Sequence, residues 1–269
     1  MGTMRHSGGR ASGLAPLVTL AALAVIAMAL FLPPHGALDK ADRAAFAVCH
    51  RIEARTFSIA GRPLPLCARC SGSYLAAVGA LAILALRGRI RADLLPRRPY
   101  LLLFGIFLVA WAFDGFNSFL TFFPEIPHLY EPRNNLRLLT GALQGLALAA
   151  ILLPMINRAF RPHHTGIASV SSMADLAPLL AAGGLVVLAV SSDWAPLLYP
   201  LAILSGLAVV GFASLLNVLF LIILRDGGHA TWLHARAARL ALGIALALVE
   251  LSAVALARGA LEARLGQPF

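Results

Sequence analysis

The chain has 269 residues, of which 59% are hydrophobic and only 13% are charged, and its mean hydropathy is +0.82. A soluble domain of this length cannot bury so much apolar surface, so the composition excludes a soluble globular protein and predicts that a lipid bilayer is its solvent. The formal net charge is +10, but the arginines lie between apolar segments without a basic stripe of interleaved aromatic residues, so we expect no nucleic-acid partner.

Seven apolar segments follow one another along the chain and predict an all-α, polytopic transmembrane helical bundle. The first segment, residues 14–32, contains no charged residue and is interpreted as an uncleaved first span. The second begins near Cys67 or Ser71 and ends at Leu86. The other five predicted spans are residues 99–123, 136–156, 175–191, 197–224 and 237–257.

Three parts are distinguished along this single bundle. Residues 1–44 form an N-terminal anchor helix and the start of the outer loop, residues 45–156 form a Cys/His motif domain with spans two to four, and residues 157–269 form a C-terminal bundle with spans five to seven. Within the long polar loop, residues 39–55 predict a short helix at the membrane interface, with Phe46 and Ile52 toward lipid.

The connector at residues 87–98 sets the expected orientation of the bundle. It carries a dense cluster of arginines with one acidic residue, Asp93, which we expect to be solvated. Short arginine-rich loops remain on the cytoplasmic side of membrane proteins. We therefore predict an integral, multi-pass cell-membrane protein with a cytoplasmic N-terminus and an extracytoplasmic cysteine loop.

All the cysteines fall in one stretch, Cys49–Tyr74, which reads CHRIEARTFSIAGRPLPLCARCSGSY and leads into the second span. Cys67 and Cys70 lie one helical turn apart, and the turn predicted at residues 61–65 allows Cys49 to fold back onto them. Thiolates and imidazole are the ligands of closed tetrahedral zinc sites. We therefore expect a metal site made of Cys49, His50, Cys67 and Cys70, with zinc as the ion and copper or iron as alternatives.

The fourth ligand of such a site is left open by the sequence. Because adjacent residues rarely both reach one ion, His50 is also compatible with a place beside the metal. In that arrangement Asp114 or His128 supplies the fourth ligand.

Two other interpretations of the thiols stay open. In one, the protein is a membrane thiol–disulfide oxidoreductase with a quinone-like partner: Arg69 and the helix start favour a thiolate in the Cys67–Cys70 pair, and Cys49 resolves the mixed disulfide. Such relays usually need two cysteine pairs, which disfavours this role for a chain with one pair and one single cysteine. In the other, the cysteines form an inert disulfide or clip.

A second group of polar residues is predicted inside the membrane on the same side as the cysteines. It comprises Asp114, Asn117, Asn134, Asn135 and Arg137. Ionisable residues in a span are costly and usually face a partner or a cavity, so we expect Asp114 to pair with Arg137. This pair is either a structural link between spans three and four or part of an intramembrane enzyme or transporter, and no catalytic residue is assigned.

The sequence resembles a known family over about residues 45–155. Cys49-His50, Arg55-x-Phe57 and the run from Gly61 to Tyr74 are similar to the first block of domain-of-unknown-function family 2085. Asp114-Gly115 and Asn134–Gly141 are similar to its second and third blocks. The resemblance implies a bacterial or archaeal membrane protein whose blocks form one site, and it implies no reaction or cargo.

Overall fold

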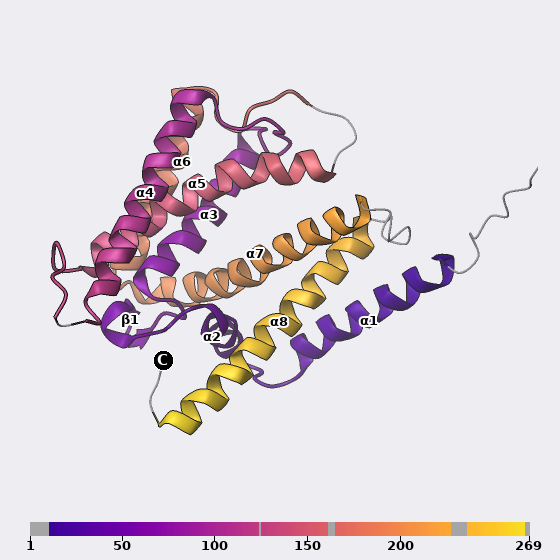
Figure 1. Cartoon of the computed structure of the whole chain (residues 1–269), viewed down its shortest axis with the longest axis horizontal. Coiled ribbons are helices and arrows are strands. Elements are labelled where there is room, and N and C mark those ends of the chain that lie inside the picture. Colours follow the sequence, from indigo (N-terminus) through magenta and orange to yellow (C-terminus); the bar gives the residue numbers. More distant parts are fainter. Residues whose placement is uncertain (1–10, 124, 161–164, 227–235, 267–269) are drawn as a thin grey trace, which may run out of the picture. The chain divides into compact units, whose positions relative to one another are not determined.

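The computed structural model describes residues 11–123, 125–160, 165–226 and 236–266, and helices make up most of this part of the chain (Figure 1). Six described helices are long and apolar enough to cross a membrane, which confirms the all-α polytopic fold. The chain divides into two compact units. One consists of residues 49–208, and the other consists of the described residues before and after that range.

The long helices closely follow the predicted spans. They are α1 (Ala11–Phe31), α3 (Ala68–Leu86), α4 (Arg98–Leu120), α5 (Asn134–Phe160), α6 (Met173–Ser191), α7 (Leu198–Asp226) and α8 (Arg236–Leu265). The first of them differs from the other six because its apolar part, Pro16–Phe31, is shorter than a full span. Most of the predicted cytoplasmic segment 1–13 lies outside the described residues.

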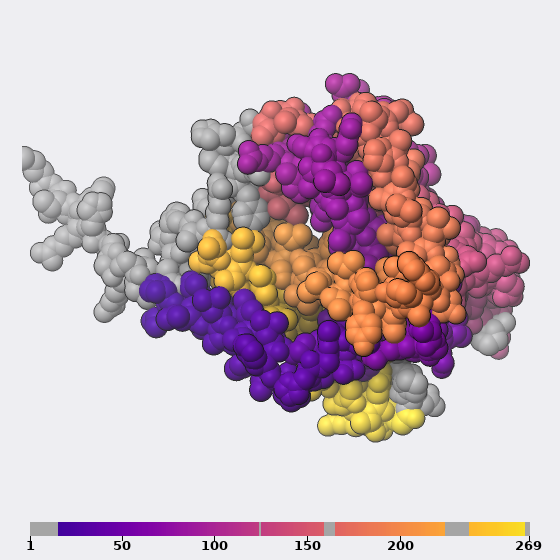
Figure 2. Space-filling view, turned by 180° about the vertical axis from the view of Figure 1, so that it is seen from behind, coloured from indigo at the N-terminus to yellow at the C-terminus, as the bar shows by residue number. Residues whose placement is uncertain are grey.

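Large apolar side chains remain exposed along α1, which is the indigo segment in Figure 2: Leu17, Leu20, Leu23, Met28, Leu30 and Phe31. Exposed apolar residues also occur along α4, α6, α7 and α8. A lipid environment satisfies such surfaces, whereas water does not.

The helix predicted at residues 39–55 is shorter in the structure, where α2 spans Ala37–Val48. The guanidinium of Arg258 in α8 lies over the ring of Phe46, and its Cζ atom is 4.2 Å from the ring centroid. Arg258 also donates a hydrogen bond of 3.0 Å to the Phe46 carbonyl. Ile52 lies beyond the end of α2, so the prediction that this helix extends to residue 55 is wrong.

In the unit of residues 49–208, α3 and α5 cross in direct backbone contact. A Cβ atom at Gly141 would lie 2.2 Å from the carbonyl oxygen of Arg69, and one at Gly145 would lie 2.2 Å from that of Ser73. Gly72 of α3 approaches α5 just as closely. Gly141 and Gly145 form a GxxxG pattern, which allows membrane helices to approach at their backbones.

A two-stranded hairpin returns the chain from Cys49 to the start of α3. Strands β1 (Ser58–Ile59) and β2 (Arg62–Pro63) are antiparallel and are joined at Ala60 and Gly61, which have positive φ angles of 51° and 77°. This geometry suits a two-residue hairpin loop with glycine in its second position. The turn predicted near Gly61 is therefore present.

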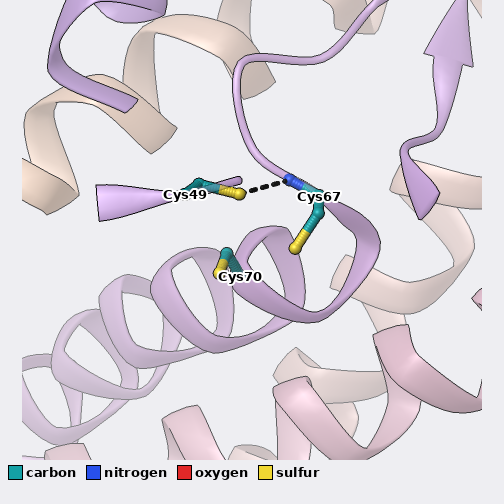
Figure 3. Close-up of side chains that lie close together, drawn as sticks. All are labelled: Cys49, Cys67 and Cys70. Carbon is teal, nitrogen blue, oxygen red and sulfur yellow. Dashed lines mark hydrogen bonds between the residues drawn. The ribbon is translucent and has the colours of Figure 1, made fainter. Parts of the chain in front are cut away.

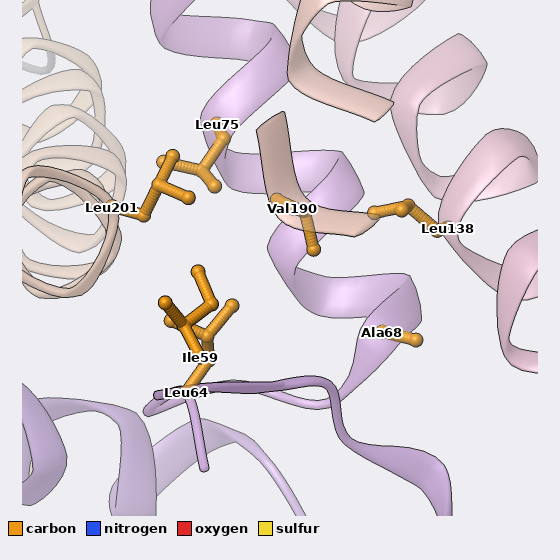
Figure 4. Packing of buried hydrophobic residues seen from close by; sticks show 7 residues of the cluster. All are labelled: Ile59, Leu64, Ala68, Leu75, Leu138, Val190 and Leu201. Carbon is orange, nitrogen blue, oxygen red and sulfur yellow. The ribbon is translucent and has the colours of Figure 1, made fainter. Parts of the chain in front are cut away.

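The hairpin is anchored by apolar side chains (Figure 4). Ile59 and Leu64 are buried and pack in one cluster with residues of α3, α5, α6 and the first part of α7, namely Ala68, Leu75, Leu138, Val190 and Leu201. Burying two such side chains contributes several kcal/mol, at about 1.5–3 kcal/mol each. The hairpin therefore fixes the route by which Cys49 reaches α3.

The expectation of a solvated Asp93 is wrong. Only 4% of this residue is exposed, its amide donates to the Ile167 carbonyl at 3.0 Å, and its carboxylate accepts a 2.9 Å hydrogen bond from the Thr165 hydroxyl. Burial raises the pKa of Asp93, but the hydrogen bonds from Thr165 outweigh burial and leave the pKa below its usual value. Asp93 thus joins the connector between α3 and α4 to the one between α5 and α6.

Candidate metal centre

The structure brings the three cysteine side chains together at the start of α3 (Figure 3). Their Sγ atoms all lie within 4.8 Å of one another. Cys67 immediately precedes the helix, Cys70 lies in its first turn, and Cys49 enters from the loop that follows α2. Sulfurs around a tetrahedral zinc ion are separated by about 3.8 Å, given Zn–S bonds of roughly 2.3 Å. The triad is therefore within a small side-chain adjustment of a metal-binding geometry.

Backbone amides are directed at the sulfur of Cys49. The amide of Cys67 donates to Cys49 Sγ at 3.2 Å, shown by the dashed line in Figure 3. The amide of Arg51 also donates to this sulfur, and Arg51 has a positive φ of 53°, which turns the chain sharply after the cysteine. Amide donors stabilise a thiolate and are an outer-shell feature of metal–thiolate sites.

The three thiols differ in the direction in which their surroundings shift the pKa. Hydrogen bonds from the Cys67 and Cys70 side chains, with those from the amides, lower the pKa of Cys49 although burial opposes ionisation. The hydrogen bond to Cys49 raises the pKa of Cys67, and burial adds to this effect. Cys49 is therefore the most readily ionised of the three thiols. A metal ion at the triad would have to displace the remaining protons before all three sulfurs could bind it.

His50 does not join this set of ligand atoms. Among the residues that the structure describes, only the three cysteines form a group with metal-ligand spacing. The amide of Ile52 donates to His50 Nδ1 at 3.0 Å, and burial lowers the pKa of the imidazole. A neutral ring that accepts at Nδ1 carries its proton on Nε2, so neither nitrogen offers a lone pair to a metal.

Asp114 forms its ion pair with Arg69 rather than with Arg137, so the predicted pairing is wrong. The carboxylate is 1% exposed and accepts hydrogen bonds from Arg69, including one of 3.2 Å from Nε. It also accepts from the Tyr130 hydroxyl at 2.7 Å and from the Thr140 hydroxyl at 3.2 Å. Asp114 therefore links α3, α4 and α5, and it lies outside the group of ligand atoms that the three cysteines form.

Asn117 and Asn134, two of the polar residues predicted inside the membrane, hold the backbone of loops. Asn117 accepts a 2.7 Å hydrogen bond from the Leu129 amide and donates one of 2.9 Å to the Tyr130 carbonyl. Asn134 donates to the Ala54 carbonyl at 3.1 Å. Asn135 is exposed.

Arg137 is 7% exposed and donates to Asn134 Oδ1 at 2.9 Å and to Ser118 Oγ at 3.4 Å. His128, which the sequence offered as a fourth ligand, lies in the loop between α4 and α5, where its Nε2 is 2.9 Å from Glu131 Oε1. It is not part of the thiol group.

Comparison with known proteins identifies the segment that carries this site. Residues 49–151 match the family described as "Predicted membrane protein (DUF2085)". The chain is also similar to the uncharacterized protein MJ1492 of Methanocaldococcus jannaschii, with 29% identity over 108 residues. That alignment covers 40% of this chain and 63% of the relative. No solved structure matches the chain.

The DUF2085 segment contains the whole thiol triad together with Arg69, Asp114 and Arg137. The family description and the long apolar helices establish a multi-pass membrane protein. The segment begins at Cys49, the same residue at which the compact unit of residues 49–208 begins. The resemblance inferred from the sequence blocks is therefore confirmed over this segment.

Arg69, which lies between two cysteines, was predicted from the sequence only to favour a thiolate, and its role as the partner of Asp114 was missed. Its position in the first turn of a span, on a side chain long enough to reach a neighbouring helix, is the signal that was available. The small residues Gly141 and Gly145 were a second signal, because their spacing predicts the close helix contact that brings α5 to Arg69.

Proposed function

We propose that the DUF2085 segment binds one zinc ion through the thiolates of Cys49, Cys67 and Cys70. The observation that carries this proposal is the convergence of three sulfurs within 4.8 Å. The ion would fasten the loop after α2 to the first turn of α3, and its proposed role is to hold the fold of the segment. Zinc suits thiolate ligands and has no redox chemistry of its own.

The burial of the thiols supports metal binding over disulfide exchange. Cys49 and Cys67 are each 4% exposed, and Cys70 is partly exposed. In disulfide exchange a thiolate attacks a sulfur of a disulfide bond, and the other sulfur of that bond leaves. Reactive cysteines are therefore usually accessible. Here the sulfur with the lowered pKa, Cys49, is one of the buried ones.

The fourth coordination position falls to a water molecule or to a small bound group. The described residues supply three ligand atoms to the group, and His50 in its present tautomer supplies none.

We also propose that the triad faces the extracytoplasmic side. The arginine-rich connector 87–98 lies at the other end of α3, and short loops of this composition stay in the cytoplasm. On an oxidising face, a bound ion would protect three neighbouring thiols from oxidation.

The experiment is elemental analysis of the purified full-length protein, with the single variants Cys49→Ser, Cys67→Ser and Cys70→Ser. Zinc binding predicts about one zinc per chain in the wild type, and loss of zinc together with reduced thermal stability in each variant. Ser58→Ala, an exposed hydroxyl change in the hairpin, is the control and should keep the metal. The proposal fails if the wild type holds no metal and Cys67→Ser retains its stability while losing thiol–disulfide exchange, which would identify an oxidoreductase.

A further inference from the structure

Three arginine side chains gather around the last turns of α4, beside the thiol triad. Arg69 donates to Ser118 Oγ at 2.9 Å, and Arg137 donates to the same oxygen at 3.4 Å. Arg55 donates to Thr121 Oγ1 at 2.9 Å, and that hydroxyl donates to the Ser118 carbonyl. All three guanidinium groups therefore lie around one short stretch of backbone, although they come from η1 (Glu53–Arg55), α3 and α5.

The positive charge of this cluster exceeds the negative charge that contacts it. Asp114 is the one carboxylate among the described residues that forms an ion pair with any of the three arginines, and it pairs with Arg69. Burial and then the charge of Arg69 lower the pKa of Arg55. A zinc ion held by three thiolates carries one net negative charge, so an occupied metal site would still leave the cluster positive.

The helix geometry adds to this excess. Arg69 and Arg137 lie in the first turns of α3 and α5, and neither first turn contains an acidic residue. Helix N-termini carry partial positive charge and favour anions, so cations are disfavoured there. Two helix starts and three arginines therefore direct positive potential at the same region of the unit.

The arginines retain donors for a ligand. Arg137 is 7% exposed, and its Nε and Nη1 atoms donate hydrogen bonds to described residues. In Arg55, Nη2 is the one atom that donates to a described residue. The guanidinium of Arg55 rests on the Phe122 ring, with Cζ 4.2 Å from its centroid, which fixes its plane. A planar guanidinium presents paired N–H groups that match the oxygens of phosphate.

We propose that Arg55, Arg69 and Arg137 form a binding site for a phosphate-class oxyanion. The oxyanion is either the phosphate of an anionic lipid head group or a soluble phosphate. The starts of α3 and α5 are ends of candidate spans, and the ends of spans lie at the level of the lipid head groups. The site is distinct from the thiol triad because none of its three arginines is a metal ligand.

The test uses purified full-length protein in two arms. In neutral, phosphate-free detergent, inorganic phosphate is added and thermal unfolding is followed. In phosphatidylcholine nanodiscs with and without phosphatidylglycerol, the bound phosphatidylglycerol is counted by native mass spectrometry. Arg55→Gln is the main variant because Arg55 is half-buried in η1 and lies outside the long helices. Arg133→Gln, an exposed charge in the loop before α5, is the matched control.

The wild type should bind in at least one arm: stabilisation by phosphate indicates a soluble ligand, and retention of phosphatidylglycerol alone indicates a head group. Arg55→Gln should weaken binding about tenfold or more, since it removes a charge-assisted contact. Arg133→Gln should change binding by less than about twofold, because exposed charges contribute little. Binding in neither arm, or equal losses in the two variants, would overturn the proposal. Zinc content, measured in parallel, should be the same in both variants.

Discussion

The contact between α3 and α5 gives a sharp prediction for Gly141→Ala. The new Cβ would lie 2.2 Å from the Arg69 carbonyl oxygen, 3.0 Å from its carbon and 3.2 Å from Cα. All three atoms are backbone, so no side-chain rotation relieves the clash and the helices must move apart by about 1 Å to restore ordinary contact. Overpacking of this kind costs about 1–3 kcal/mol, which exceeds the gain of roughly 0.5–1 kcal/mol from replacing a helical glycine.

The displacement should also reach the metal centre. Arg69 lies between Cys67 and Cys70, so a shift of its backbone moves the two sulfurs relative to Cys49. We expect Gly141→Ala to lower both the free energy of unfolding, by about 1–3 kcal/mol, and the zinc retained after purification.

Gly105→Ala in α4 is the control, because its Cβ would meet nothing within 4 Å. Its free energy of unfolding should stay the same or rise by up to about 1 kcal/mol. The assay is reversible unfolding in mixed micelles, together with elemental analysis of each variant. Equal stability of the two variants would refute the claim that direct backbone contact joins α3 to α5.

Three further predictions concern the buried ion pair, the metal and the topology. Asp114→Asn should destabilise the protein by about 3 kcal/mol because it leaves Arg69 without its carboxylate, whereas the exposed Glu131→Gln should change the unfolding free energy by less than about 0.5 kcal/mol; denaturant unfolding compares them, and equal effects would contradict the pairing. A strong chelator should lower the Tm of the wild type but not that of Cys49→Ser, measured by differential scanning fluorimetry, and an unchanged wild-type Tm would argue against a structural ion. An impermeant maleimide should label Glu53→Cys in intact cells and Arg91→Cys only after lysis, and the reverse pattern would invert the orientation.

The helices were predictable because each span is a long apolar run between polar connectors, and the bilayer imposes that length on the sequence. The predicted spans 175–191 and 197–224 thus correspond closely to α6 and α7. The proximity of the three cysteines was also foreseeable, since Gly61 marks the turn that allows Cys49 to return.

Side-chain partners were less predictable, because they depend on how helices rotate about their axes. Asp114 was expected to pair with Arg137 on the next span. The close contact of α5 with α3 at Gly141 instead brings Arg69 near Asp114, and Arg69 forms the ion pair. Asp93 looked solvated because its connector is rich in arginine, yet it binds a loop more than seventy residues further along the chain. Such long-range contacts leave no periodic pattern in the sequence.

The role of His50 depends on a single hydrogen bond that sequence spacing does not encode. The Ile52 amide lies only two residues away and engages Nδ1, and the sharp turn at Arg51 makes this contact possible. A histidine next to a cysteine in a thiol-rich stretch was therefore expected to be a ligand or a close neighbour. In the structure, His50 is not part of the group of ligand atoms that the three cysteines form.

X-ray absorption spectroscopy at the zinc edge, on the purified full-length protein, tests the central claim most directly. Zinc held by Cys49, Cys67 and Cys70 predicts three sulfur scatterers at about 2.3 Å and one nitrogen or oxygen scatterer at about 2.0–2.1 Å. In Cys49→Ser, any zinc that remains should show no more than two sulfur scatterers. A wild-type spectrum with only nitrogen and oxygen neighbours, or one that Cys49→Ser leaves unchanged, would contradict the three-thiolate site.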